Sequence, residues 1–208
     1  MFSIIQAAGW PIWPLVACSI LALALVIERF LSLKTAKIAP PKLLEEVIAV
    51  TRQNVPGPDV INQLEQNSAL GEVLASGLRA LNTHPGCSQE ELHASMEATG
   101  RRVAHRLERY LNALATIASA APLMGLFGTV VGMIEIFGSQ PAGSATGGNP
   151  AQLAHGISVA LYNTAFGLIV AIPSLIFWRY FRGRVDEFLL TLELSAEQLA
   201  RHLNHLRK

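Results

Sequence analysis

Residues 110–134, YLNALATIASAAPLMGLFGTVVGMI, decide the fold because they form an uncharged and mostly apolar run of 25 positions. A second uncharged run, GISVALYNTAFGLIVAIPSLIFW, occupies residues 156–178. A transmembrane helix needs about 20 apolar residues to cross roughly 30 Å of hydrocarbon. Each run is therefore long enough and apolar enough to span a membrane as a single helix.

A third candidate span lies near the N-terminus. Residues 1–27 carry no charge, and residues 12–27 are nearly all apolar. Trp10 and Trp13 precede or open this run, and tryptophan side chains anchor helices at membrane interfaces. A cleaved signal peptide is the alternative, but such a peptide begins with a basic region, which this N-terminus lacks. The sequence therefore predicts an all-α membrane protein with three transmembrane helices.

The composition is typical of a membrane protein and argues against a nucleic-acid-binding protein. Hydrophobic residues make up 51% of the chain and charged residues 15%, whereas soluble domains carry about 25% charged residues. The net charge of +1 provides no basic surface for nucleic acid, so we expect no nucleic-acid partner. All 16 Lys and Arg residues lie in residues 29–42, 52–109 and 179–208.

This distribution of basic residues predicts the topology. Basic residues follow the first run, and the positive-inside rule places such segments in the cytoplasm. The second run then leads outward and the third leads back, which also places the uncharged connection outside. We expect an external N-terminus at 1–9, transmembrane helices at 10–33, 110–138 and 153–178, a cytoplasmic helical domain at 34–109, an external loop at 139–152 and a cytoplasmic C-terminal helix at 179–208.

The second and third spans are expected to continue into long cytoplasmic helices. Ser88 and Glu91 have the spacing of a capping box, which begins a helix, and the apolar period after them runs unbroken into the second span. We predict one helix from about residue 88 to about residue 137. In the third span, a coiled-coil-like series of apolar and small residues runs from Ala160 to Leu206. This series predicts self-assembly, although packing within the chain accounts for part of it.

Small residues recur at helical spacing in the second and third spans, where they allow close approach of helix backbones in lipid. This predicted packing seam consists of Gly125, Gly128, Gly132, Ala160, Gly167 and Ala171. Uncharged polar residues lie beside it: Thr129, Ser158, Asn163 and Thr164. Threonine in membrane helices often bonds back to its own helix. Two threonines beside glycine stripes nevertheless favour a narrow polar path.

Glu135 is the only charged residue between Arg109 and Arg179. Its position about 25 residues beyond Arg109 predicts a place near the outer interface, where an ordinary solvated carboxylate is tolerated. Charges at the bilayer centre are costly and usually functional, and this chain has none there. If the chain conducts protons, another polypeptide must supply the titrating acid.

Enzymatic and metal-dependent functions find little support. The glycine-rich segment at residues 125–132 lacks the lysine of a phosphate-binding loop. His84, Cys87 and His93 match no standard metal-ligand spacing, and no nucleophile motif is present. We expect no enzyme activity, no metal and no cofactor.

The two glycine-containing spans resemble the MotA/TolQ/ExbB proton-channel family. Residues 121–132 match the pattern APxxGLxGTVxG, and residues 156–173 match GIxxALxxTxxGLxxAIP. The three predicted spans resemble ExbB, a biopolymer transport protein, and TolQ more than the four-span flagellar MotA. The motifs cover about 30 residues, and the predicted layout covers nearly the whole chain.

This resemblance implies a homo-oligomeric ring, a pentamer in family members, around an ExbD- or TolR-like partner with one span and a buried Asp. Proton flow would drive work on a TonB-like protein that energises outer-membrane transport from the bacterial inner membrane. Thr129 and Thr164 match the family's pore threonines. The alternatives are a TolQ-like role in envelope maintenance and a non-conducting membrane scaffold.

One position departs from the family pattern. Many ExbB sequences carry glutamate in the third-span motif where this chain has Val159. No glutamate role can be transferred to this chain, which agrees with the expectation that the proton-binding carboxylate comes from the partner.

Overall fold

The computed structural model describes residues 9–52, 56–84, 86–138 and 150–206, and this part of the chain is helical without any strand. Three of its helical stretches are long and apolar enough to cross a membrane: Ile12–Ser32, Gln89–Gly138 and Gly156–Asn204. The predicted fold class, all-α with three candidate spans, is confirmed. The predicted external loop lies almost wholly outside the described residues, as does most of the predicted external N-terminus.

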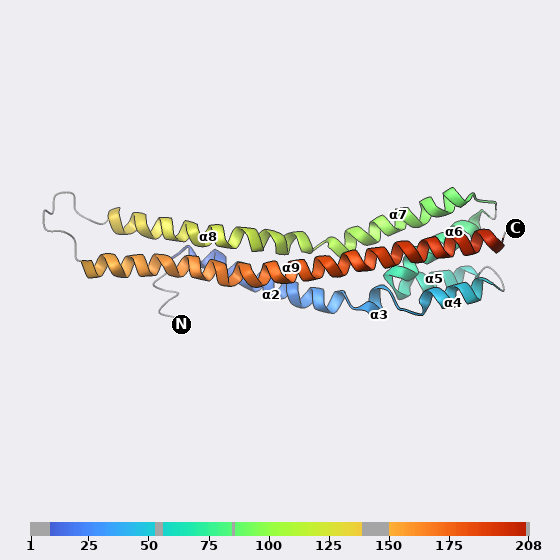
Figure 1. The fold of residues 1–208 in the computed structure, drawn as a ribbon, viewed down its shortest axis with the longest axis horizontal. Coiled ribbons are helices and arrows are strands. Elements are labelled where there is room, and N and C mark those ends of the chain that lie inside the picture. Colours follow the sequence, from blue (N-terminus) through green and yellow to red (C-terminus); the bar gives the residue numbers. More distant parts are fainter. Residues whose placement is uncertain (1–8, 53–55, 85, 139–149, 207–208) are drawn as a thin grey trace. The chain divides into compact units, whose positions relative to one another are not determined.

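The chain divides into two compact units, which are described separately. Unit 1 contains residues 1–28 and 110–180, and unit 2 contains residues 29–109 and 181–208. Figure 1 labels the helices of both units, from α2 to α9. Each of the three crossings between the units lies at or near the change from an apolar run to a basic segment.

Unit 1 is built from α2 (Ile12–Ser32) up to residue 28, α8 (Leu111–Gly138), and the first part of α9 (Pro150–Leu206). Many of its large apolar side chains are exposed, among them Leu123, Ile134 and Ile169 at 64–66% exposure. Apolar side chains facing hydrocarbon cost nothing, because lipid tails are as apolar as leucine. This exposure fits a membrane-embedded unit.

Unit 2 collects the shorter helices around a buried core. It contains α3 (Thr35–Ile38), α4 (Leu43–Thr51), α5 (Pro58–Asn67), α6 (Ala69–Thr83), α7 (Gln89–Glu108) and the later part of α9. Leucines at helical spacing on α6 form much of this core, with Leu70, Leu74 and Leu78 at most 2% exposed. Burial of each such side chain contributes roughly 1.5–3 kcal/mol.

The beginning of α7 has the predicted capping box. Glu91 N donates to Ser88 Oγ at 3.1 Å, and Ser88 N donates to Glu91 Oε2 at 2.8 Å. Two backbone donors that helix geometry leaves unpaired are thereby satisfied. The sequence therefore located this helix start correctly.

The single helix predicted from residue 88 to residue 137 is interrupted. α7 ends at Glu108 and α8 begins at Leu111, with a turn at Arg109 and Tyr110. Just before the turn, the Nη1 of Arg29 donates a 2.8 Å hydrogen bond to the Leu107 carbonyl. This buried contact comes from a residue 78 positions away. The local sequence contains no helix breaker at the turn, so only the folded structure reveals the interruption.

Replacing Arg29 by methionine is expected to destabilise unit 2 by about 2 kcal/mol. Arg29 is 3% exposed, and its removal leaves a buried carbonyl without this charge-assisted donor. The cation also complements the negative C-terminal end of α7. Titration of the purified protein with denaturant measures the effect. Lys37→Met, which changes an exposed side chain of α3, is the control, and equal stability of the two variants would contradict the assigned role.

α9 continues without a break for 57 residues and contains Pro173 in its interior. Its apolar series in unit 2 is already buried within the chain, since Phe181, Val185, Leu192, Leu199 and Leu203 are all at most 3% exposed. The series was predicted to need partner helices, with packing inside one chain as the alternative. In unit 2 the alternative is correct for these residues.

Candidate functional site

Unit 1 brings the two glycine-containing spans into direct contact. Figure 1 shows α8 beside the first part of α9, and the glycines define how closely they approach. A Cβ added at Gly125 would lie 2.7 Å from the Asn163 carbonyl oxygen, and one at Gly167 would lie 2.6 Å from the Ala121 carbonyl oxygen. Both distances are too short for real atoms, so only glycine permits this backbone approach.

The remaining small residues of the seam lie along the same contact. A Cβ at Gly132 would lie 3.3 Å from Ala160 Cβ, and one at Gly128 would lie 2.8 Å from Asn163 Cβ. Ala160 and Ala171 are buried at 3% and 5% exposure. The six predicted seam residues are thus all buried or part-buried. An added Cβ at any of the four glycines among them would lie against the opposite helix.

Asn163 places a polar side chain inside this contact. It is 2% exposed, and its side chain lies over Gly128. Burial of an amide is costly unless the amide is hydrogen-bonded. A side chain at position 128 would occupy the space of this amide, so Gly128 and Asn163 depend on each other.

Thr164 links the two helices by a hydrogen bond. Its Oγ1 donates to the Gly125 carbonyl at 3.2 Å, across 39 residues of sequence. A threonine hydroxyl more often bonds the carbonyl of its own helix. Thr164 instead donates its single hydroxyl hydrogen to the neighbouring helix. The acceptor is the carbonyl of Gly125, where the absence of a side chain lets the two backbones approach closely.

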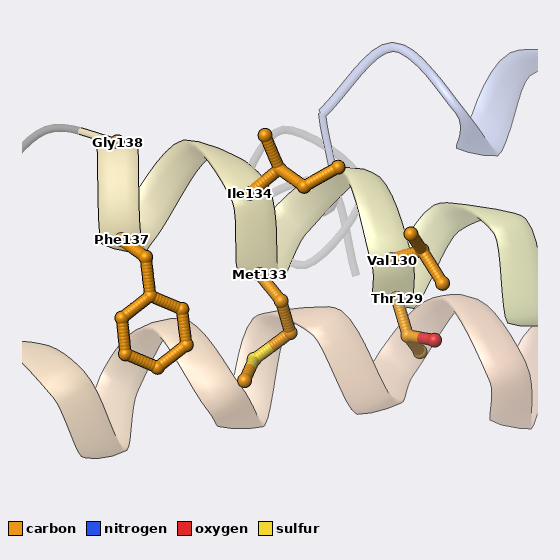
Figure 2. Close-up of a pocket in the computed structure, with 6 residues that line it drawn as sticks. All are labelled: Thr129, Val130, Met133, Ile134, Phe137 and Gly138. Carbon is orange, nitrogen blue, oxygen red and sulfur yellow. The ribbon is translucent and has the colours of Figure 1, made fainter.

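Thr129 behaves differently. Its Oγ1 donates to the Leu126 carbonyl of its own helix at 2.6 Å. Thr129 also lines a hollow on α8 together with Val130, Met133, Ile134, Phe137 and Gly138. In Figure 2, Met133 and Phe137 project on one side of the helix and Ile134 on the other. The structure therefore places Thr164 in the α8–α9 contact and Thr129 on a surface hollow.

Ser158 and Glu135 lie outside the contact. Ser158 Oγ donates to the Ala154 carbonyl of its own helix at 2.9 Å. Glu135 is exposed, near the end of α8. The side chain of Val159 lies outside the described part of the structure. Among the described residues, no three His, Cys, Asp or Glu side chains converge to hold a metal ion.

The sequence did not identify two features of unit 1. Met133 and Phe137 share the hollow with Thr129. The three residues follow one another at intervals of four, which places them on one face of a helix, and this spacing is the signal that could have found them. Trp10 packs edge-on against Phe127, with ring centroids 6.1 Å apart. This aromatic contact joins distant parts of the chain, so no local pattern predicts it.

Residues 65–194 match the sequence model of the MotA/TolQ/ExbB proton channel family. The Synechocystis sp. protein named ExbB-like 3 is 35% identical over 193 residues, which cover 92% of this chain and 90% of that protein.

Two further relatives carry more specific names. The biopolymer transport protein exbB1 of Vibrio cholerae is 31% identical over 174 residues, covering 81% of this chain and 73% of its own. The Tol-Pal system protein TolQ of Pseudomonas aeruginosa is 33% identical over 180 residues, covering 83% of this chain and 77% of its own. The match therefore extends through both units and does not separate an ExbB name from a TolQ name.

Proposed function

The chain belongs to the MotA/TolQ/ExbB proton channel family, and we propose that it is the ExbB-like, ring-forming subunit of a proton-driven complex in the bacterial inner membrane. The ring surrounds an ExbD-like partner with one span, and the complex energises TonB-dependent outer-membrane transport. The observation that carries the proposal is the hydrogen bond from Thr164 to Gly125, because it joins the two spans at residues that both belong to the family motifs.

We propose a topology with the N-terminus outside and the C-terminus in the cytoplasm. Arg29, Lys34, Lys37 and Lys42 all follow the first span, and the positive-inside rule favours the cytoplasm for them. Unit 2, which holds the charged helices, is then cytoplasmic, and unit 1 is embedded in the membrane.

The acid that carries the proton comes from the partner in this proposal. Glu135 is the only carboxylate between residues 110 and 178, and its exposed place near the end of α8 is far from mid-span. A partner carboxylate buried against α8 and α9 needs hydroxyl or amide groups to solvate it. Thr164 and Thr129 supply the hydroxyl groups, and Asn163 and Ser158 are two further polar side chains of these spans.

Thr164 can respond to the charge of that carboxylate. A threonine hydroxyl has one hydrogen to donate and two lone pairs that accept. When the partner's Asp is protonated, Thr164 accepts its hydrogen and continues to donate to the Gly125 carbonyl. When the Asp ionises, the hydroxyl rotates and donates to the carboxylate instead. Each protonation cycle therefore makes and breaks one bond between α8 and α9.

The energy available for this cycle is modest. A membrane potential of 100 mV supplies about 2.3 kcal/mol per charge, which is similar to one or two hydrogen bonds in a protected site. A switch that exchanges one hydrogen bond for another therefore suits the driving force better than one that must unfold a helix.

A TolQ-like role in envelope maintenance is the second candidate. The 33% identity to the Pseudomonas TolQ is close to the 31% identity to the Vibrio exbB1, so similarity favours neither system. A non-conducting scaffold needs only the tight glycine contact, whereas a channel also needs proton transfer at the threonines. Measurement of proton flux separates the scaffold from both channel roles.

The proposal is tested by co-expression with an ExbD-like single-span protein, followed by native mass measurement and reconstitution into vesicles with a pH-sensitive dye. We expect a complex with several copies of this chain and a smaller number of partner copies. Vesicles containing the complex should acidify in response to an applied potential, and vesicles with this chain alone should not. A monomer that ignores the partner would contradict the proposal.

A further inference from the structure

Two exposed lysines follow directly on the first candidate span. α2 ends at Ser32, and Lys34 and Lys37 are both exposed. Lys37 N donates to the Lys34 carbonyl at 2.9 Å, and this bond closes the single turn that forms α3. The two lysines are therefore no more than one helical turn apart, and their flexible four-carbon side chains can reach the same anion.

The backbone that carries these lysines is fixed by its neighbours in unit 2. Leu33, Ile38 and Ala39 are 8%, 3% and 6% exposed, so apolar side chains are buried on both sides of the lysines along the chain. Arg184 Nη2 also donates to Thr35 Oγ1 at 3.2 Å, which ties α3 to the later part of α9. Lys34 and Lys37 thus extend from a packed turn and not from a free linker.

The charges of the two lysines are not neutralised within unit 2. Glu187 lies beside this contact on α9, but its carboxylate is paired with Arg184 Nη1 at 2.6 Å. The ion pairs formed by the described residues involve neither Lys34 nor Lys37. Each ammonium group therefore has hydrogens to donate to an external anion. Arg184 acts only as a positioning residue, because it holds Thr35 and occupies Glu187.

An exposed apolar side chain lies just before the lysines. Leu31 is on the last turn of α2, three residues before Lys34, and is 56% exposed. In the proposed topology this end of α2 meets the cytoplasmic face of the bilayer, where the hydrocarbon gives way to headgroups. A lysine at such a place lays its apolar stem along the membrane and keeps its charge at headgroup level. Leu31 and the lysines therefore match the two parts of a phospholipid, an acyl chain and an anionic headgroup.

We infer that Lys34 and Lys37 bind the phosphate of an anionic phospholipid in the cytoplasmic leaflet, and that an acyl chain of this lipid lies against Leu31. The inference rests on the proposed topology and goes beyond the proposed function, because it assigns a lipid ligand to the chain. A basic side chain near an anionic membrane surface strengthens binding roughly fivefold. Two such side chains should favour an anionic lipid over a zwitterionic one by about 25-fold.

The test measures which lipid the purified protein retains. The full chain, with its partner or alone, is equilibrated in detergent with equal amounts of phosphatidylglycerol and phosphatidylcholine and is then weighed by native mass measurement. We expect at least one phosphatidylglycerol for each copy of the chain, with a preference over phosphatidylcholine of about tenfold or more. Lys34→Gln combined with Lys37→Gln removes both charges, and this variant should bind one phosphatidylglycerol fewer per copy.

Two matched variants separate this site from a general effect of charge. Lys34→Arg combined with Lys37→Arg keeps both charges and should retain phosphatidylglycerol as the wild type does. Arg52→Gln combined with Arg201→Gln removes the same number of charges from exposed positions of unit 2. Arg201 lies seventeen residues beyond Arg184 on α9, which is about 25 Å along a helix. This control should also keep the wild-type preference.

Equal retention of phosphatidylglycerol by the wild type and by the Lys34→Gln, Lys37→Gln variant would overturn this inference and leave the proposed function intact. Displacement of the lipid by millimolar inorganic phosphate would also overturn it, because a free anion makes no contact with Leu31.

The topology on which the inference rests has its own test. Lys37→Cys, in a background with Cys18→Ser and Cys87→Ala, should react with a membrane-impermeant maleimide only after the membrane of intact spheroplasts is opened. Reaction before the membrane is opened would place α3 outside the cell, and it would overturn this inference together with the proposed topology.

Discussion

Replacement of Thr164 by valine is expected to reduce proton flux through the assembled complex by about ten- to a hundredfold while leaving the oligomer intact. Valine has nearly the same shape as threonine, but it can neither donate to the Gly125 carbonyl nor solvate a partner carboxylate. The measurement is dye-reported proton flux in vesicles, at matched protein content, together with native mass of the same preparation.

The expected size follows from the energy of the lost interaction. A hydrogen bond to a charged group contributes about 1.5–3 kcal/mol, and each 1.4 kcal/mol changes a rate or equilibrium about tenfold. The loss of folding stability should be smaller than the loss of the interaction with the charged carboxylate. The Thr164 hydrogen bond to Gly125 is long, at 3.2 Å, and joins two neutral groups. Function should therefore be lost before the helix contact is.

Thr164→Ser is the matched control, since it keeps the hydroxyl and removes only a methyl group. It should restore at least a third of the wild-type flux. Thr129→Val tests whether the second hydroxyl acts in the same way, although its hydrogen is used within α8. Wild-type flux in the Thr164→Val complex would contradict the proposed proton pathway.

The membrane spans could be predicted from the sequence because the lipid around a span restricts it to uncharged and mostly apolar residues. Charged side chains are costly inside hydrocarbon, so a membrane span forms a long uncharged run, and the runs at 110–134 and 156–178 are visible in the sequence without any structure. The interruption at Arg109 and Tyr110 could not be predicted. It coincides with the hydrogen bond from Arg29 to Leu107, a tertiary contact that leaves no mark on the local sequence.

The site was only partly visible in the sequence. Stripes of small residues predicted which faces of the spans could approach a helix, but not that α8 and α9 of one chain would use these faces on each other. Thr129 follows Gly125 by four residues and Thr164 follows Ala160 by four. Their patterns are alike, yet only Thr164 bonds across the contact. The rotation of each helix decides this, and packing of the whole unit sets that rotation.

Replacement of Gly167 by leucine is expected to destabilise unit 1 by about 3 kcal/mol or more and to abolish proton flux. A Cβ at this position would lie 2.6 Å from the Ala121 carbonyl oxygen and 3.1 Å from Gly125 Cα. Both neighbours are backbone atoms, so no side chain can rotate to make room. α8 and α9 must separate, and overpacking that shifts the backbone typically costs 1–3 kcal/mol and occasionally more.

The direction of the stability change in Gly167→Leu shows whether the α8–α9 contact or helix propensity dominates at this position. Leucine favours a helix over glycine by nearly 1 kcal/mol, so a free helix would be stabilised by the change. Separation of the helices would also lengthen the bond from Thr164 to Gly125 beyond the usual hydrogen-bond limit, since it is already 3.2 Å. Loss of stability and loss of flux should therefore occur together, unlike in Thr164→Val.

Ala165→Leu provides the matched control, because Ala165 is exposed and lies two residues away on the same helix. Both variants are unfolded in mixed detergent by titration with SDS, and the midpoints are compared with the wild type. We expect a lower midpoint for Gly167→Leu and an unchanged or higher one for Ala165→Leu. If Gly167→Leu were as stable as the control, α8 and α9 would not meet at Gly167, and the proton pathway would need a different pair of helices.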